Sequence, residues 1–266
     1  MYFQLIKKSS TKILETNDIA KYSSWSSLSK IIPLLPRGWY ELTKFSSEER
    51  INLVKEFWLS QLCQSSIEYD EIAKIDDFFN CLEDIVICAF QDCYERHFNV
   101  KMIYLIKNSN IFFSGNPPFS SCYDNLRLQL WNDLPKSYYN FFNIHDGFSC
   151  YDDLGIISTK KISRIYYQFQ DYLEKEELIS TYKELNLSSF IPFYGGSLIH
   201  SYQCFLVNLS FDKEEPLNVP FLENNLKDLN SLLIDSDSSL FENNIFSSFI
   251  AWLGYYLSIR KDIKNI

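Results

Sequence analysis

The sequence of 266 residues predicts an α+β protein. Apolar residues recur at three- and four-residue spacing over about 47–62, which predicts an amphipathic helix. Between residues 100 and 107 the pattern changes to a period of two, which predicts a strand. Hydrophobic residues make up 46% of the chain, which is typical of a globular protein with a real core.

The first predicted helix begins at a capping box and carries a clear apolar stripe. Ser46 and Glu49 have the spacing of a box in which each side chain satisfies the other residue's backbone N–H. The stripe that follows consists of Ile51, Val54, Phe57, Trp58 and Leu62. Its spacing places these residues on one face of a helix over about 47–62.

A second, longer helix is expected from the spacing of apolar residues between 75 and 93. Its stripe consists of Ile75, Phe78, Phe79, Leu82, Ile85, Val86, Ala89, Phe90 and Cys93. The opposite face carries Asp76, Asp77 and Asp84, within a stretch, 68–96, of nine acidic and two basic residues. Two interpretations stay open, a solvated helix face or a patch that binds a basic partner.

A hairpin follows, made of strands at 100–106 and 111–113 around the turn residues Asn108-Ser109-Asn110. The segment Ser114-Gly115-Asn116-Pro117-Pro118 ends this hairpin. We therefore expect a domain boundary near residue 118. It would separate an N-terminal α+β region, 1–118, with two helices and a hairpin, from a second domain, 119–266.

The second domain is predicted to contain a short aromatic helix within residues 130–148. Pro135 fits its first position, and Gly147 can take the left-handed conformation that closes a helix. Tyr138, Phe141, Phe142 and His145 share one face. The elements expected next are a strand at 155–157, a helix over 162–184, strands at 189–194 and 202–211, and a helix over about 240–259 that starts at a Ser239–Glu242 capping box.

Histidine spacing offers no metal or catalytic site. His97, His145 and His200 lie 48 and 55 residues apart, which is unlike the local ligand spacing of a zinc site. His145 and Asp146 are adjacent, so on a helix their side chains point about 100° apart and do not form an oriented acid–base pair. We expect His145 to be a satisfied, partly buried histidine.

The cysteines and the net charge point to the same broad class of protein. Cys81, Cys88 and Cys93 fall on or beside the apolar stripe of the second helix, so we expect core thiols rather than nucleophiles. The net charge of −9 disfavours nucleic acid and suits a basic protein partner. Seven cysteines without a CxxC pair, and no long apolar run, fit a cytoplasmic protein with reduced thiols and no membrane span.

Several short motifs in the C-terminal half resemble one family in their order. Residues 134–142 (LPKSYYNFF) resemble an opening LPxxYxxFF helix, and residues 145–148 (HDGF) resemble the xDGF turn after it. The later pieces are GII at 155–157, IPFYGG at 191–196, YQCFLVN at 202–208 and FSSFIAWL at 246–253. In this order they resemble the SUKH superfamily over about 125–258. Val207-Asn208 departs from the common Leu-Asp-Leu, and residues 1–120 have no counterpart.

The resemblance implies an α+β fold with a mixed or antiparallel sheet flanked by helices. It also implies a role, because many bacterial members of this superfamily are immunity proteins that bind and neutralise a toxin encoded beside them. Some eukaryotic members are regulatory scaffolds, and family members are not enzymes. Toxic nuclease domains are often basic, which suits an acidic immunity protein.

We therefore expect an immunity protein whose partner is a cognate toxin domain, such as a basic nuclease domain. A regulatory scaffold is the first alternative, and an enzyme with a diffuse site that uses His145 or His200 is the second. No cofactor, metal, nucleic acid or membrane partner is expected, and the sequence does not indicate the oligomeric state. The residues expected to contact the partner are Asp146, Tyr151, Asp152, Asp153 and Tyr194 on an exposed rim, and Asp76, Asp77 and Asp84 on the acidic face.

Overall fold

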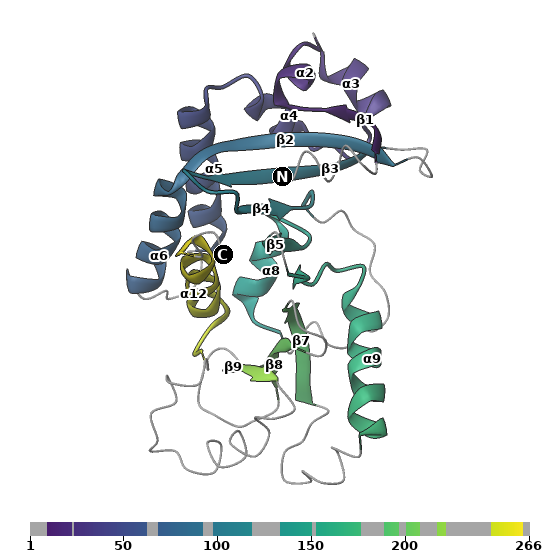
Figure 1. The fold of residues 1–266 in the computed structure, drawn as a ribbon, viewed down its shortest axis with the longest axis vertical. Coiled ribbons are helices and arrows are strands. Elements are labelled where there is room, and N and C mark those ends of the chain that lie inside the picture. Colours follow the sequence, from purple (N-terminus) through teal and green to yellow (C-terminus); the bar gives the residue numbers. More distant parts are fainter. Residues whose placement is uncertain are drawn as a thin grey trace. The chain divides into compact units, whose positions relative to one another are not determined.

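The chain folds into two compact α+β units, which confirms the predicted fold class (Figure 1). The computed structural model describes residues 10–22, 24–62, 69–92, 98–118, 134–150, 153–176, 189–196, 201–207, 217–221 and 246–262. Unit 1 comprises Met1–Phe119, Asn140–Tyr151 and Gly254–Ile266, and unit 2 comprises Ser120–Tyr139 and Asp152–Leu253. This division differs from a single cut at residue 118, because two later segments belong to unit 1.

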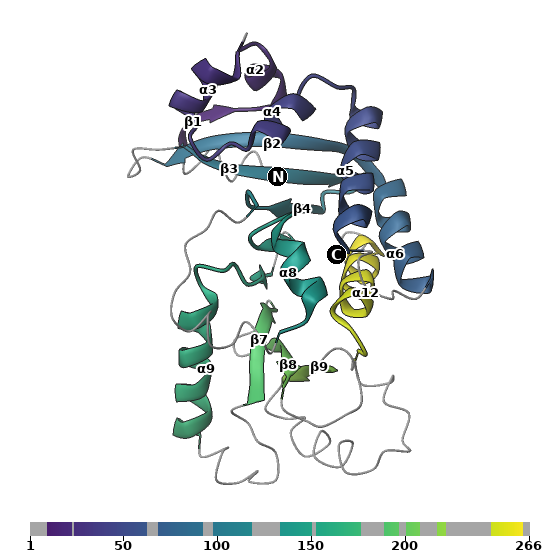
Figure 2. The ribbon, with the colours of Figure 1, turned by 180° about the vertical axis from the view of Figure 1, so that it is seen from behind.

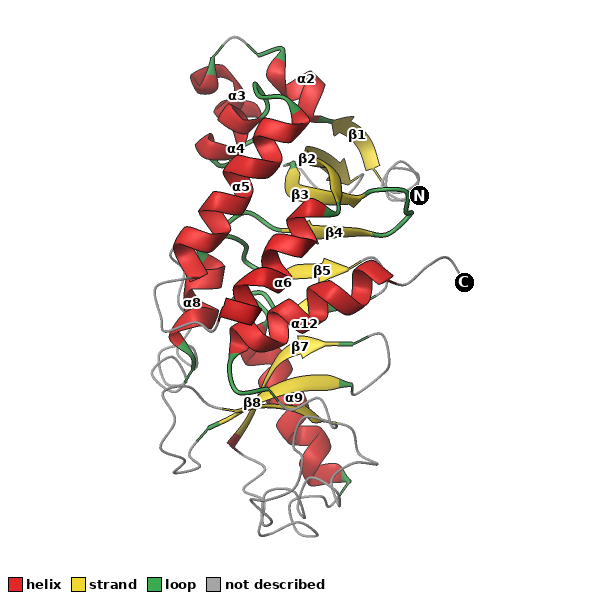
Figure 3. Ribbon diagram, turned by 90° about the vertical axis from the view of Figure 1, so that its left-hand side faces the viewer, coloured by secondary structure: helices red, strands yellow, loops and turns green. Residues whose placement is uncertain are grey.

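Unit 1 contains an antiparallel arrangement of strands in chain order, with helices packed against it. The strands are β1 (Ser10–Leu14), β2 (Leu82–Asp92), β3 (Asn99–Ile106), β4 (Phe112–Gly115) and β5 (Phe148–Cys150). The helices are α2 (Thr16–Ala20), α3 (Trp25–Ile31), α4 (Arg37–Leu42), α5 (Ser47–Leu62) and α6 (Tyr69–Asn80). Helix α5 contacts β2, and Figure 3 shows the helices of this unit along one side of its strands.

Helix α5 and the hairpin agree with the sequence patterns that predicted them. The Ser46 backbone N–H donates to the Glu49 carboxylate at 2.9 Å, as the capping box predicts. Val54 and Trp58 are buried, whereas Phe57, which belongs to the same predicted stripe, is 45% exposed. Strands β3 and β4 pair as an antiparallel hairpin, which confirms the second prediction.

The predicted helix over 75–93 is wrong beyond residue 80. Helix α6 ends at Asn80, a turn follows at Cys81, and β2 begins at Leu82. The run Ile85–Ala89 is buried on both faces of the strand, including Ile87 and Cys88, which the proposed helical stripe left out. A strand buried on both faces is a continuous apolar run, and periodicity does not distinguish such a run from a buried helix.

Helix α8 (Lys136–Phe142) is shorter than the sequence predicts. Pro135 stands directly before its first residue, and the Pro135 carbonyl accepts the Tyr139 N–H at 3.3 Å. The helix stops at Phe142, so His145 lies in the turn that follows rather than on the helix face. Gly147 has a φ of 97°, but it lies in the turn into β5 instead of closing the helix.

Unit 2 has a second set of antiparallel strands and an aromatic core. The strands are β6 (Gly155–Ile156), β7 (Phe190–Gly195), β8 (Tyr202–Leu206) and β9 (Leu217–Phe221). Helix α9 (Ile162–Lys175) contacts β7, and Figure 2 shows the two side by side. Helix α12 (Phe249–Asp262) contributes Phe249 and Trp252 to a core that also contains Tyr138, Phe193 and Phe205.

Most elements predicted for unit 2 are present where the structure describes the chain. The strands at 155–157, 189–194 and 202–206 and the start of the helix at 162 are confirmed. Residues 177–184, 208–211 and 240–245, and the Ser239–Glu242 box, lie outside the described residues. The last helix begins later than predicted, because residues 246–248 are not helical and the Ser248 hydroxyl accepts the Ala251 N–H at 3.0 Å.

The sequence predicts no membrane-spanning helix. Over the ranges given above, the structure contains no helix with both the length and the apolar character needed to cross a bilayer. This agrees with the absence of a long apolar run in the sequence.

Candidate functional site

A chain of hydrogen bonds runs through the core of unit 1. The Trp58 Nε1–H donates to the Tyr104 hydroxyl at 3.1 Å. The Tyr104 hydroxyl lies 2.6 Å from His145 Nε2, and His145 Nδ1 lies 2.9 Å from the Asn116 carbonyl oxygen. Because a carbonyl oxygen only accepts, His145 Nδ1 carries the proton, and Nε2 accepts from Tyr104. We call this chain, from Trp58 through Tyr104 and His145 to Asn116, the buried relay.

Aromatic rings surround the relay and hold it neutral. The His145 ring stacks on Phe148 with 5.6 Å between centroids, and the edges of Trp39 and Trp58 approach it at 5.7 and 5.9 Å. Burial lowers the pKa of His145 to about 4, against a smaller opposing effect of its hydrogen bond to Asn116. Burial also raises the pKa of Tyr104 far above its usual value. Both groups are therefore uncharged at neutral pH.

The prediction of a satisfied histidine at position 145 is confirmed, and its burial is complete. His145 is 0% exposed and both ring nitrogens have partners. The expected exposed rim at Asp146 is wrong, because Asp146 is only 8% exposed. Its backbone explains the burial: the Asp146 N–H donates to the Pro117 carbonyl at 3.3 Å, and its carbonyl accepts from Asn116 Nδ2 at 2.8 Å. The turn is thus tied into the core of unit 1.

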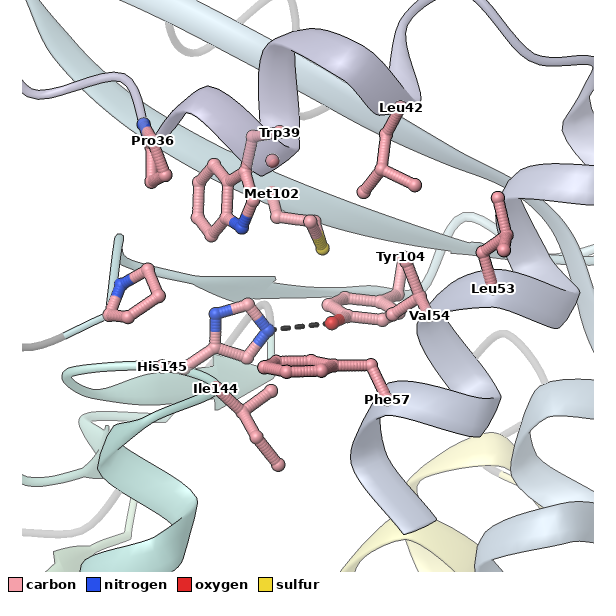
Figure 4. A pocket seen from close by; sticks show the side chains of 12 residues that line it. Pro36, Trp39, Leu42, Leu53, Val54, Phe57, Met102, Tyr104, Ile144 and His145 are labelled. Carbon is pink, nitrogen blue, oxygen red and sulfur yellow. Dashed lines mark hydrogen bonds between the residues drawn. The ribbon is translucent and has the colours of Figure 1, made fainter. Parts of the chain in front are cut away.

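An apolar pocket of about 290 Å³ lies beside the relay in unit 1. Its floor is formed by Met102, Tyr104 and His145, and Gly38, Leu53 and Phe57 lie at its mouth. Figure 4 shows side chains from α4, α5, β3 and the turn after α8 arranged around one space, with the Tyr104–His145 hydrogen bond on its inner side. Pro118, which follows β4, also lines this space, so the described chain brings five separate segments together to form the pocket.

The acidic residues predicted as one helix face are separated in the structure. Asp84 lies in β2, where its carboxylate accepts two hydrogen bonds from Arg50 at 2.8 and 2.9 Å. Arg50 is only 8% exposed, so this ion pair joins α5 to the strand. Asp76 accepts from Lys55 at 2.9 Å, and this contact lowers the pKa of Asp76. Asp77 is exposed on α6, so the proposed patch is not the single surface that the sequence suggested.

The predicted residues of unit 2 form one contact. The Tyr194 hydroxyl donates to the Asp153 carboxylate at 2.9 Å. The Tyr194 ring lies 5.0 Å from that of Trp252 on α12, which fixes its orientation. Tyr151 and Asp152 lie outside the described residues, as do His97 and His200. The structure therefore brings Asp153 and Tyr194 together and places Asp146 in the other unit.

Three of the four described cysteines are core thiols. Cys88 and Cys204 are 0% exposed, and burial raises the pKa of Cys88 to about 12 and that of Cys204 well above its usual value. Cys150 is buried and Cys81 is half-buried, while Cys93 lies outside the described residues. In the part of the chain that the structure describes, no cluster of three or more histidine, cysteine or acidic residues gathers to hold a metal ion.

Sequence reasoning missed two residues that organise unit 1. Arg50 stands four residues before Val54 and eight before Trp58, so helical spacing could have shown it as a member of the buried face. Tyr104 meets His145 across 41 residues of sequence, and no local spacing signals that pairing. Comparison with known proteins adds no further signal: no family model, no curated protein and no solved structure matches this chain.

Proposed function

We propose that this protein acts by binding another protein, and that it is an immunity protein that neutralises a cognate toxin domain by direct contact. The observation that carries this proposal is the charge of the exposed side chains on α5 and α6. Among the described residues of these helices, the exposed ionic side chains are five carboxylates and one ammonium group. The carboxylates belong to Glu48, Glu49, Glu56, Asp70 and Asp77, and the ammonium group belongs to Lys74.

This distribution suits a basic partner. Arg50 and Lys55 of α5 do not neutralise the exposed carboxylates, because Arg50 is paired with Asp84 and Lys55 with Asp76. A field of one sign attracts a surface of the opposite sign and raises the association rate, in a way that added salt weakens. The whole chain, with a net charge of −9, adds to that field.

The described histidine and buried cysteines serve the core of the protein, which also supports a binding role over a catalytic one. The only histidine among the described residues, His145, serves as a neutral link in the buried relay. Burial raises the pKa values of the Cys88 and Cys204 thiols. The motifs that resemble the SUKH superfamily fall in chain order on α8, β6, β7, β8 and α12, which supports the immunity role.

The test is a binding measurement between the full chain and the C-terminal domain of the protein encoded beside its gene. We expect a complex at micromolar concentrations and inhibition of that domain's toxicity. A Glu56→Lys/Asp77→Lys double variant should lower the association rate about tenfold at low salt. The effect should disappear at high salt, because ions screen exposed charges.

The matched control is Asp171→Lys/Glu174→Lys, which reverses two exposed charges on α9 in unit 2. It makes the same change in net charge, so it separates a local effect of α5 and α6 from the overall field. If both double variants lower the association rate equally, the exposed carboxylates of α5 and α6 have no special role in binding. The absence of any complex at micromolar concentrations would remove the proposed function itself.

A further inference from the structure

The apolar pocket of unit 1 has walls that are mostly carbon, although two polar side chains form part of its floor. The Tyr104 hydroxyl donates to His145 and accepts from Trp58, and the proton of His145 Nδ1 is bound to Asn116. These two donors are already used within the protein, while Trp39 adds an indole N–H to the lining. The described lining contains no lysine or arginine, so a charged occupant would lose its hydration with little compensation.

The volume of the pocket limits the size of the occupant. A cavity of about 150 Å³ lined by apolar side chains is large enough to bind benzene. The pocket here measures about 290 Å³, which is roughly twice that volume. Two fused rings, such as those of indole or naphthalene, match this space better than one ring does.

The lining favours aromatic over aliphatic groups. Trp39, Phe57 and Tyr104 each present a ring to the space, and Met102 adds a polarisable thioether (Figure 4). Aromatic rings pair favourably with other rings in edge-to-face and offset geometries, and sulfur packs favourably against ring edges. These contacts are directional, so a flat aromatic molecule uses them better than a flexible chain.

The pocket is also open to entry from solvent. Leu53 and Phe57 are 40% and 45% exposed, whereas Tyr104 and His145 at the floor are 0% exposed. The apolar mouth leaves large side chains in water, and a bound molecule would cover part of them. The gradient from exposed mouth to buried floor is that of a preformed ligand site.

We propose that this pocket is a binding site for an uncharged, bicyclic aromatic small molecule. The site is independent of the proposed toxin partner, and the protein alone is sufficient to test it. Binding at this site would add contacts to α4, α5 and β3, the elements that carry its walls.

The chain offers a specific reporter for the test. It contains two methionines, Met1 and Met102, and Met102 lies at the floor of the pocket. Full-length protein labelled with ¹³C on the methionine methyl groups therefore gives two signals. Titration with indole should shift the Met102 signal in a saturable way, with a Kd below about 1 mM.

Gly38 provides a blocking variant that preserves the fold. A Cβ atom at Gly38 would meet no other atom within 4 Å, so Gly38→Leu can extend into open space at the mouth. Leucine is also the better helix former within α4. Gly38→Leu should weaken indole binding about tenfold. The control Asn52→Leu adds the same side chain at an exposed position of α5 outside the pocket and should leave the Kd within about twofold.

A charged probe tests the chemical class. Indole-3-carboxylate should bind about tenfold more weakly than indole, because the described lining holds no lysine or arginine to pair with its carboxylate. Equal binding of the two probes, no saturable Met102 shift below about 1 mM, or unchanged binding in Gly38→Leu would each overturn the proposal. If indole does not bind but Gly38→Leu abolishes the complex with a toxin domain, the pocket holds a side chain of that partner and the small-molecule site is wrong.

Discussion

Each unit is centred on a fully buried tyrosine, Tyr104 in unit 1 and Tyr138 in unit 2. The Tyr104 hydroxyl takes part in two hydrogen bonds of 2.6 and 3.1 Å to other side chains. The Tyr138 hydroxyl donates to the Ile157 carbonyl at the longer distance of 3.4 Å, while its ring packs against Phe205 at 5.0 Å. Packing places the tyrosine in both units, but the hydrogen bonds of Tyr104 are shorter and join it to two other side chains.

The largest expected difference between the units comes from removing these two hydroxyl groups. Tyr104→Phe leaves the Trp58 Nε1–H and His145 Nε2 without their partner inside the core. We expect a loss of about 3 kcal/mol in the free energy of unfolding, because each buried orphan costs about 1–3 kcal/mol. Tyr138→Phe gives up a long hydrogen bond and should cost less than about 1 kcal/mol.

Urea denaturation of the two variants and the wild type measures both costs under one set of conditions. The two changes are chemically identical and both sites are buried, so each variant controls for the other. Equal costs would contradict the distinction drawn between the two cores.

The second difference concerns a glycine at the end of a strand in each unit. A Cβ atom at Gly115 in β4 would collide with the His145 ring, which the relay holds in place through both nitrogens. A Cβ atom at Gly195 in β7 would lie 3.0 Å from the Leu154 Cβ, which a shift of a few tenths of an ångström in the exposed Leu154 relieves. Gly115→Ala should therefore destabilise the protein by about 2 kcal/mol, and Gly195→Ala by less than about 0.5 kcal/mol.

Thermal unfolding of the two alanine variants checks this ranking. A double variant, Gly115→Ala/His145→Ala, removes the ring with which the new methyl group collides. The added cost of Gly115→Ala should be smaller in the His145→Ala background than in the wild type. If Gly115→Ala costs as much in the His145→Ala background as in the wild type, the new methyl group collides with something other than the His145 ring.

The third expected effect, similar in size to that of Gly115→Ala, is a response of unit 1 to acid. The folded pKa of His145, about 4, lies below its ordinary value of 6.5, so the unfolded chain binds its proton more readily. The resulting stability is complete above pH 6.5 and is lost as the pH falls toward 4. Between pH 7 and pH 5 we expect a loss on the order of 2 kcal/mol from this residue.

Amide hydrogen exchange at the two pH values locates this response. Protection in β3, which carries Tyr104, should fall between pH 7 and pH 5 after correction for the intrinsic exchange rate. Strand β7 of unit 2 should change less, since His145 and its hydrogen-bond partners belong to unit 1. An NMR titration that places the pKa of His145 near 6.5 would contradict the expectation.

The elements that the sequence predicted correctly are those marked by a pattern among residues close together in the chain. The capping box at Ser46 and Glu49 marks the start of α5, and the alternation of residues 100–106 marks β3. Strand β2 was missed because its apolar run is buried on both faces, and such a run carries no period of two. The start of α12 was placed too early, because the aromatic spacing continues into residues that are not helical.

The candidate site was predictable only in part, for a related reason. His145 could be recognised as a core residue from its aromatic neighbours along the chain. Its partner Tyr104 comes from β3, and the walls of the pocket come from five segments that only tertiary packing brings together. Asp84 was assigned to a partner surface because its pairing with Arg50, 34 residues away, leaves no local pattern.

The position of Tyr256 on α12 has a consequence for synthesis of the chain. Its hydroxyl accepts the Cys150 N–H at 2.8 Å across 106 residues, and its ring meets the edge of Phe113 in β4. The ribosome releases residue 256 long after β4 and β5 have emerged. Until then, Cys150 and Phe113 in the nascent chain lack their contacts with Tyr256. Contacts between residues so far apart in sequence slow folding, so α12, which is made well after β4 and β5, completes a core that was begun much earlier.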